Sequence, residues 1–169
     1  MKHSFCDGWE FTRHWTEAFG KGLPVPKQEV VRLPHTCREV PLHYASPADY
    51  EMVCGYRKRF QVPPVQAAPR LFVRFDGAAH QAVVRVNGKL AGQHRGGYTG
   101  FAVEITDLVD REGENLLTVQ LDTREDPAIP PFGFVIDYLT YGGLYREVWL
   151  EATAESRPTD LFVYTPTLH

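Results

Sequence analysis

Hydrophobic and polar residues alternate along much of this chain, with the period of two that is typical of β-strands. In one such stretch Leu71, Val73 and Phe75 share one face, while Phe72 and Arg74 share the other. Alternation of this kind buries one face of a strand and leaves the other face toward solvent. Helical periodicity is almost absent, so we expect a protein built from strands.

Short alternating stretches bounded by turn residues recur along the chain. The expected strands, about nine in number, span residues 29–33, 56–62, 71–75, 82–86, 89–94, 101–105, 116–121, 144–151 and 161–164. Residues 7–19 are the one stretch where a short helix is expected. Asn87-Gly88 favours a type I′ hairpin turn, because both residues tolerate a positive φ. The pattern indicates an all-β fold, an antiparallel β-sandwich of jelly-roll type.

The length of 169 residues suits a single domain with a sizeable core. Residues 1–49 carry few alternating stretches and several prolines, so we expect an extended N-terminal segment packed on the sandwich. The net charge is −3 and no basic stripe is present, which speaks against a nucleic-acid partner. No apolar run approaches the roughly 20 residues that cross a bilayer. Residues 1–10 also lack the apolar segment of a secretory signal.

The three cysteines, Cys6, Cys37 and Cys54, are odd in number and show no C-x-x-C spacing. We therefore expect reduced thiols in a cytoplasmic protein that has no membrane partner. His35 and Cys37 could begin a metal site, but no second cluster of ligands accompanies them. The sequence therefore predicts neither a metal nor a cofactor.

One long connection, residues 122–143, fits no strand, and its aromatic residues and prolines favour an ordered loop. It ends with Asp137, Tyr138, Tyr141 and the pair Gly142-Gly143. Glycines let the backbone turn sharply into the strand that follows. The pair either makes a simple turn or holds an acid and aromatic rings against a ligand. A carboxylate suits sugar hydroxyls because it accepts charge-assisted hydrogen bonds, and the rings could stack on a sugar face.

Three longer stretches carry a specific combination of motifs. They are YRKRFQVP at 56–63, VNGKLAGQHRGGYTGFAVEITDLVDREGENLLTVQLD at 86–122 and DYLTYGGLYREVWLEA at 137–152. Together with Trp9-Glu10-Phe11, and in this order and spacing, they resemble the N-terminal sugar-binding domain of glycoside hydrolase family 2, the family of β-galactosidases and β-glucuronidases. The resemblance covers most of the chain.

The chain departs from the usual family pattern at a few positions. Gly55 stands where a tryptophan is usual, Gly100 where a proline is usual, and Glu104 where an aspartate is usual. These differences concern local loop shapes and indicate a divergent member of the family.

The resemblance implies a jelly roll related to galactose-binding domains, which in the family precedes an immunoglobulin-like domain and a catalytic (β/α)8 barrel. It also implies that both catalytic glutamates lie in the barrel, which this sequence does not contain. We therefore expect no catalysis by this chain alone. The parent polypeptide is expected to be an O-glycosyl hydrolase of β-galactosidase or β-glucuronidase type.

The resemblance further implies two substrate-binding residues. Asp137 matches an aspartate that reaches from this domain into the active site of the barrel and contacts sugar hydroxyls. Glu51 lies near a second substrate-facing position, which is an asparagine in some relatives. With the rings of Tyr138 and Tyr141, these residues form the expected substrate site. The expected partners are a β-glycoside and the barrel of the same polypeptide.

Other interpretations stay open. A free-standing carbohydrate-binding module would share the fold, and Asp122 and Asp126 could then ligate a structural calcium ion. A purely structural sandwich is a third possibility, in which Asp137 only stabilises its loop. A retaining glycosidase needs two carboxylates about 5 Å apart, but no sequence context marks such a pair. Tyr98 is expected to pack, and Arg146 to pair with a carboxylate from within the strand 144–151.

Overall fold

The computed structural model describes residues 1–39, 46–63, 69–130, 142–158 and 161–167 of the chain. Its strands are β1 (Lys2–Ser4), β2 (Trp9–Thr12), β3 (Glu29–Val31), β4 (Val53–Gln61), β5 (Arg70–Phe75), β6 (Gln81–Val86), β7 (Lys89–Arg95), β8 (Phe101–Glu104), β9 (Glu114–Asp122) and β10 (Val148–Thr153). A single-turn helix, α1 (Glu17–Gly20), and a 3-10 turn, η1 (Pro47–Asp49), complete the elements of the described residues.

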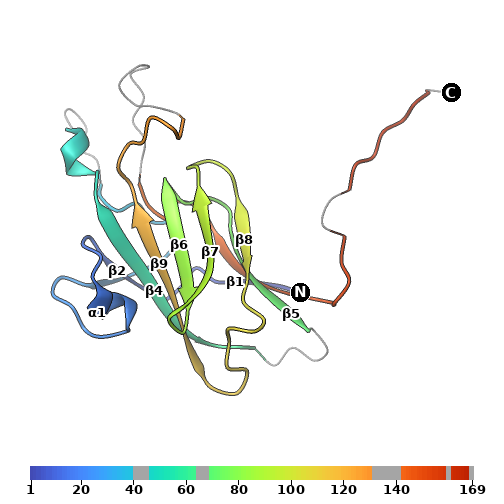
Figure 1. Cartoon of the computed structure of the whole chain (residues 1–169), viewed down its shortest axis with the longest axis horizontal. Helices are drawn as coiled ribbons and strands as arrows, with labels where there is room; N and C mark the ends of the chain where they lie inside the picture. Colours follow the sequence, from blue (N-terminus) through green and yellow to red (C-terminus); the bar gives the residue numbers. More distant parts are fainter. Residues whose placement is uncertain (40–45, 64–68, 131–141, 159–160, 168–169) are drawn as a thin grey trace.

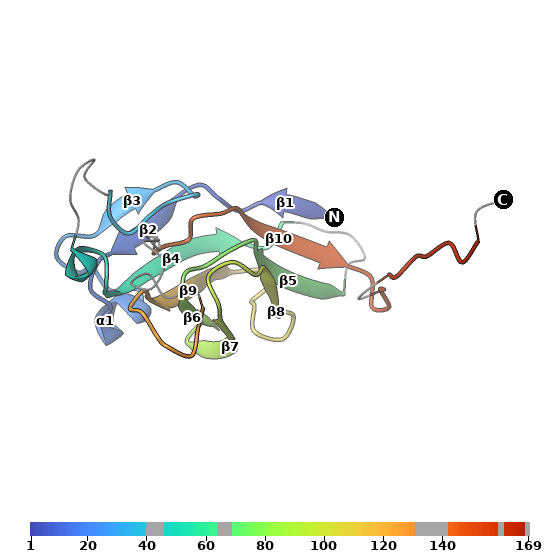
Figure 2. The same cartoon turned by 90° about the horizontal axis from the view of Figure 1, so that it is seen from above.

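Two sheets pack face to face (Figures 1 and 2). The smaller sheet has the strand order β1-β10-β5-β8, and the larger sheet has the order β3-β2-β4-β9-β6-β7. All of their strand pairs are antiparallel. The prediction of an all-β antiparallel sandwich is therefore confirmed.

Alternate residues of the strands fill the space between the two sheets. The fully buried apolar residues of β5 and β9 are Leu71, Val73, Phe75, Leu117, Val119 and Leu121. These are the faces that the alternation predicts. Full burial of one such side chain contributes roughly 1.5–3 kcal/mol, so the register of β5 and β9 is fixed by which face is apolar.

The predicted Asn87-Gly88 hairpin joins β6 to β7. Asn87 has a φ of 52° and Gly88 a φ of 79°, as a type I′ turn requires. The side chain of Asn87 accepts a hydrogen bond from the amide of Leu116 at 2.9 Å and donates one to Oδ1 of Asn115 at 2.8 Å. The hairpin is thereby tied to the start of β9.

The N-terminal segment is part of both sheets. It supplies β1 to the smaller sheet, and β2 and β3 to the larger sheet. The helix expected over residues 7–19 is wrong for most of that range, since only Glu17–Gly20 is helical. Trp9 and Phe11 are buried on β2 against the core. The pairing of β2 with β4 buries both rings. The free energy gained by this burial outweighs the weak local preference of the segment for a helix.

Residues that follow β2 cover the outer face of the larger sheet. Trp15 and Phe19 lie over Gly55 of β4, where an added Cβ would come within 2.8 Å of the first ring and 2.9 Å of the second. Arg57, also buried under this cover, pairs with Glu10 at 2.5 Å. A side chain at Gly55 would therefore overlap the rings of Trp15 and Phe19, which occupy the space above this position.

Two predictions for the C-terminal third are wrong. Residues 161–164 form no strand, and Leu161 and Phe162 are 80% and 85% exposed. The tail that contains them leaves the sandwich (Figure 1), so these apolar side chains have no sheet to pack against. The strand expected from residue 144 begins at Val148, because residues 142–147 run between distant loops.

Arg146 also differs from its prediction. It lies before β10, its guanidinium donates to the carbonyl oxygen of Tyr98 at 3.1 Å, and it forms no ion pair with a carboxylate of the described residues. It therefore ties two loops together. Among the described residues no helix is long and apolar enough to cross a bilayer.

Candidate functional site

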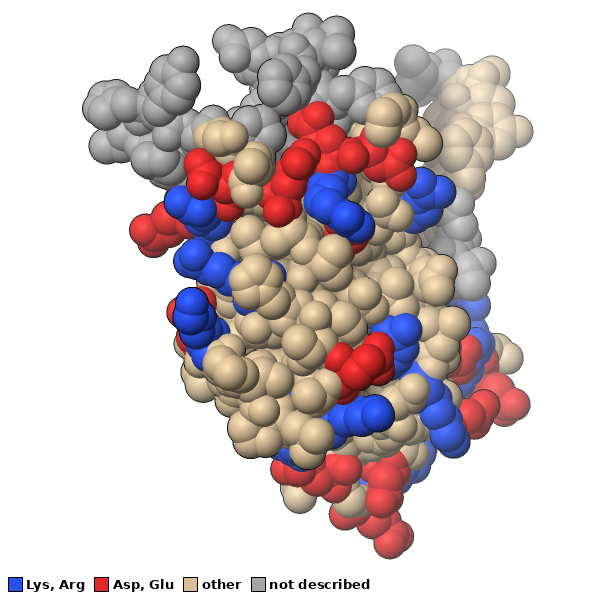
Figure 3. Space-filling model, turned by 60° about the vertical axis from the view of Figure 1, so that its left-hand side comes forward, with Lys and Arg blue, Asp and Glu red and all other residues tan. Residues whose placement is uncertain are grey.

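Several loops meet at the end of the sandwich where β9 ends, at the top of Figure 1. Main-chain hydrogen bonds join segments that are far apart in the sequence, namely residues 35–37, 52, 79–80, 96, 122–123 and 142–144. Figure 3 shows acidic side chains at this end of the molecule and at the opposite end as well. Asp137, Tyr138 and Tyr141 lie outside the described residues, so the flanks of their loop define the site.

Thr123 holds the start of the loop. Its side chain is buried, and its hydroxyl accepts a hydrogen bond from the amide of Met52 at 2.9 Å. The same hydroxyl lies 2.5 Å from the carbonyl oxygen of Tyr50, to which it donates. The amide of Thr123 also donates to the carbonyl of Met52 at 2.9 Å. The loop therefore leaves β9 from a point fixed to the segment that leads into β4.

The glycine pair holds the end of the loop. The carbonyl of Gly142 accepts from the amide of Cys37 at 2.9 Å, and the carbonyl of Gly143 accepts from the amide of Ala79 at 3.1 Å. Gly143 has a φ of 137°, and a Cβ there would overlap the carbonyl oxygen of His35. Glycine is the residue that both adopts this φ without strain and leaves room for the His35 carbonyl, because it has no Cβ. The sharp turn expected from the two glycines is thus present and clamped between two other loops.

Glu51 is the one expected site residue that the structure describes. It is half-buried between Tyr50 and Met52, and its Oε1 accepts a hydrogen bond from the amide of Glu125 at 3.3 Å. Glu51 therefore supports the main chain at the start of the loop. Its expected contact with the substrate stays a prediction.

The two aspartates considered as calcium ligands are engaged by arginines. Asp122 pairs with Arg124 at 2.6 Å, and Asp126 pairs with Arg95 at 2.7 Å. Burial alone would raise the pKa of Asp122, but the hydrogen bonds from Arg124 outweigh it and lower that pKa. The pKa of Asp126 is lowered by the amide of Ala128 and then by Arg95. Both carboxylates therefore already have cationic partners.

A pocket of about 370 Å³ lies beside the loop, between residues 95–99 and 128–130. Tyr98 lines it and is 43% exposed, so this ring does not pack into the core as expected. The loop around Tyr98 is fixed, because the hydroxyl of Tyr145 donates to the carbonyl of Gly97 and Arg146 donates to that of Tyr98. The pocket thus has a rigid wall and an aromatic rim.

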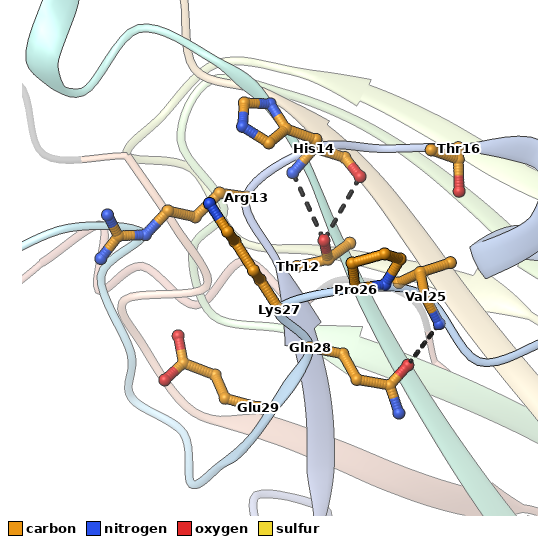
Figure 4. A pocket seen from close by; sticks show the side chains of 9 residues that line it. All are labelled: Thr12, Arg13, His14, Thr16, Val25, Pro26, Lys27, Gln28 and Glu29. Carbon is orange, nitrogen blue, oxygen red and sulfur yellow. Dashed lines mark hydrogen bonds between the residues drawn. The ribbon is translucent and has the colours of Figure 1, made fainter.

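A larger hollow of about 740 Å³ lies between the end of β2 and residues 25–29 (Figure 4). Arg13, Lys27 and Glu29 line it, so its charge is mixed. The described residues that line it include no Trp, Tyr or Phe, whose large rings a sugar site commonly uses as a stacking surface. The loop end is therefore the better candidate for a sugar site.

His35 and Cys37 do not form a metal site with their neighbours. Burial lowers the pKa of His35, and its Nδ1 lies 2.9 Å from the hydroxyl of Tyr56. Burial raises the pKa of the Cys37 thiol. No three His, Cys, Asp or Glu side chains within the described part of the chain are grouped to hold a metal ion. These two residues instead serve the clamp through their main-chain amides.

Sequence reasoning missed Thr123. It pointed to the loop and to its glycine exit, but nothing marks a threonine at the end of a strand as a contact for residues 50–52. A polar residue that continues the buried register of Leu117, Val119 and Leu121 was the available signal, since a buried hydroxyl needs partners.

The comparisons with known proteins agree with this geometry. Residues 29–154 match the profile described as "Glycosyl hydrolases family 2, sugar binding domain". This range runs from β3 to β10 and includes the candidate loop end. The chain belongs to this family of sugar-binding domains, and the resemblance drawn from the sequence motifs is confirmed.

Individual relatives are longer proteins. A β-galactosidase of Thermoanaerobacter pseudethanolicus is 41% identical over 135 residues, 79% of this chain and 18% of that protein. A β-glucuronidase of Bacteroides fragilis is 39% identical over 140 residues, 82% of this chain and 20% of that protein. The solved structure of Bacteroides uniformis β-glucuronidase 2, covalently bound to cyclophellitol-6-carboxylate aziridine, superposes with a TM-score of 0.76 at 27% identity. That match covers 91% of this chain and 18% of the other. The chain thus spans about a fifth of the length of the curated relatives it matches.

Proposed function

We propose that this chain is the non-catalytic sugar-binding domain of a family 2 glycoside hydrolase of β-galactosidase or β-glucuronidase type. It forms one domain, docks on the catalytic barrel of the parent polypeptide and lends the loop with Asp137 to the active site. The observation that carries the proposal is the clamp at both ends of that loop, by Thr123 and by Gly142-Gly143. A carboxylate that must meet a substrate needs such an anchored support.

The roles within the proposed site follow from side-chain chemistry. The carboxylate of Asp137 accepts hydrogen bonds from sugar hydroxyls, and Glu51 lies at the base of the same loop. Tyr138 and Tyr141 offer faces on which a sugar ring can stack. The bond-breaking carboxylates belong to the barrel, so this domain contributes binding and orientation.

The relatives support the substrate class. They include a β-galactosidase and a β-glucuronidase, so the proposal extends to β-glycosides and not to one sugar. Cys6, Cys37 and Cys54 are free and buried, which supports a cytoplasmic parent protein. A free-standing module stabilised by calcium has less support, because Asp122 and Asp126 are already paired with arginines.

A pair of assays tests the proposal. The isolated chain should hydrolyse neither nitrophenyl β-galactoside nor nitrophenyl β-glucuronide, whereas the full-length parent should hydrolyse at least one of them. In the parent, Asp137→Ala should lower kcat/KM about ten- to over a hundredfold, since a charge-assisted hydrogen bond is worth about 1.5–3 kcal/mol. Turnover by the isolated chain above that of a heat-denatured control would show that the domain is itself catalytic.

A further inference from the structure

The hollow of about 740 Å³ opens where β2 and β3 stop pairing (Figure 4). The last pair of that ladder is Phe11 with Glu29. Two residues beyond this pair, Arg13 on one segment and Lys27 on the other line the hollow. One wall therefore leaves β2 and the other wall enters β3.

Arg13 and Lys27 are two cations that the register of the ladder sets opposite each other. Figure 4 shows the side chain of Lys27 extending toward Arg13. Both are exposed, and neither forms an ion pair within the described part of the chain. Like charges opposite each other destabilise a strand pair, so an anion between them would supply the missing countercharge.

Lys27 is also held in an unfavourable backbone conformation. Its φ is 60°, in the left-handed region that glycine adopts without strain and a lysine rarely adopts. Residues in such conformations cluster at ligand sites and persist where the surrounding structure holds them. The position thus carries a lysine side chain although its backbone favours glycine.

The segment with Lys27 is anchored to a buried ion pair. The side-chain oxygen of Gln28 accepts from Nη2 of Arg57 at 3.1 Å, and the carbonyl of Leu23 accepts from Nη1 of Arg57 at 2.7 Å. Arg57 is 3% exposed and pairs with Glu10. This wall of the hollow is therefore fixed before any ligand arrives.

The opposite wall is held by a local turn. The hydroxyl of Thr12 accepts from the amide of His14 at 3.4 Å and lies 3.3 Å from the carbonyl oxygen of His14, to which it donates (Figure 4). These bonds bracket Arg13. Groups on anchored segments lose less freedom when a ligand binds, so both cations are partly preorganised.

We propose that this hollow binds a small organic oxyanion, a carboxylate or phosphate group on a hydroxylated molecule, between Arg13 and Lys27. Guanidinium and ammonium groups donate charge-assisted hydrogen bonds to such anions. Glu29 lines the same hollow and can accept hydrogen bonds from the hydroxyls of the ligand. The volume lies in the usual range of small-molecule sites. The inference does not depend on Asp137 and goes beyond the proposed function.

The test is a titration of the ¹⁵N-labelled 169-residue chain, followed by NMR. The probes are D-glucuronate, D-glucose 6-phosphate and the neutral methyl β-D-glucoside. Amides of residues 12–16 and 25–29 should shift saturably with at least one of the two anions, with a Kd of about 1 mM or tighter, and not with the neutral glycoside. The anion with the lower Kd identifies the preferred group. Added NaCl should raise the Kd, because salt screens exposed charges.

Variants assign the binding to the two cations. Lys27→Gly and Arg13→Gln should each raise the Kd about three- to fivefold, the upper range for exposed charge pairs, and the double variant should show no saturable shifts. Glu29→Gln should lower the Kd, because it removes a negative charge from the hollow. Lys89→Gln is the matched control: Lys89 is also exposed but lies on β7, at the opposite edge of the larger sheet, and its loss should leave the Kd unchanged.

Melting temperatures without ligand complete the test. Lys27→Gly should melt no lower than the unchanged chain, since glycine adopts a φ of 60° without strain. A lower melting temperature would show that the lysine serves folding and would overturn the argument from strain. Absence of saturable shifts with both anions, equal shifts with the neutral glycoside, or a rise in Kd for Lys89→Gln equal to that for Lys27→Gly would overturn the anion site.

Discussion

The two ends of β9 each carry a buried polar side chain that organises loops, but they do so over different distances along the chain. At the start, Asn115 accepts from the amide of Asp110 at 2.7 Å and donates to the carbonyls of Asp110 and Gly113 at 2.7 and 3.3 Å. At the end, Thr123 bonds to Tyr50 and Met52, 73 and 71 residues away in sequence.

The difference separates a structural end from a candidate functional end. Asn115 closes the turn that directly precedes it and binds the neighbouring hairpin through Asn87, so these partners lie at most 28 residues away in sequence. Thr123 joins loops that only the finished fold brings together, and these loops flank the segment with Asp137. Binding residues commonly sit on loops positioned by a rigid scaffold, and the proposed function assigns them to the end that carries Thr123.

The largest expected effect is at the functional end. Gly143→Val puts a β-branched residue at a φ of 137° and its Cβ against the carbonyl of His35. Backbone strain and overlap together should cost roughly 3–5 kcal/mol of unfolding free energy. Urea unfolding of the 169-residue chain measures it. A loss below about 1 kcal/mol would mean that the clamp is not rigid, and Gly88→Ala in the exposed hairpin provides a comparison for positive φ alone.

A smaller loss of unfolding free energy is expected at the start of β9, where Asn115 lies. Asn115→Ala removes the partners of the Asp110 amide and carbonyl in a fully buried site, which should cost roughly 2–3 kcal/mol. In the parent, enzyme that remains folded should keep its kcat/KM, because Asn115 lies at the end of β9 opposite Thr123. A fall in kcat/KM without a loss of folded protein would break the distinction between the two ends.

Acid should weaken the functional end slightly. The pKa of Asp126 in the folded chain is lowered, first by the Ala128 amide and then by Arg95. Its contribution to stability is therefore present above its unfolded pKa, about 3.9, and is lost as the pH falls through the folded value. Melting temperatures at pH 5 and pH 3 should fall less in Asp126→Asn than in the unchanged chain. Equal falls in both would show that this carboxylate adds no pH-dependent stability.

The sheets of this protein can be predicted because their signal is local. Leu117, Val119 and Leu121 alternate over one strand, and Asn87-Gly88 identifies its hairpin by turn chemistry alone. The local signal is misleading at Trp9 and Phe11, where a helix is expected from the sequence, because these residues form a strand whose burial depends on the distant β4. It also fails at residues 161–164, which have the composition of a strand but lie outside both sheets.

The candidate site is less predictable for the same reason. The two glycines mark the exit of the loop, but the clamp needs amides from Cys37 and Ala79 that no motif connects to them. Thr123 finds its partners only after β4 and β9 pair. Sequence therefore points to the loop, and the folded structure supplies what positions it.

The most direct test of the account compares Asp137→Ala with Asp107→Ala, an exposed aspartate in the loop at the opposite end of β9. Asp107→Ala should shift the unfolding free energy of the isolated chain by no more than about 0.5 kcal/mol, as for most surface substitutions. The proposed role of Asp137 in binding rather than in folding predicts a shift no larger than that for Asp137→Ala. In the parent enzyme, kcat/KM should fall about ten- to over a hundredfold for Asp137→Ala and stay unchanged for Asp107→Ala. Equal kcat/KM values for the two variants would contradict the claim that this domain lends a substrate-binding carboxylate to the active site.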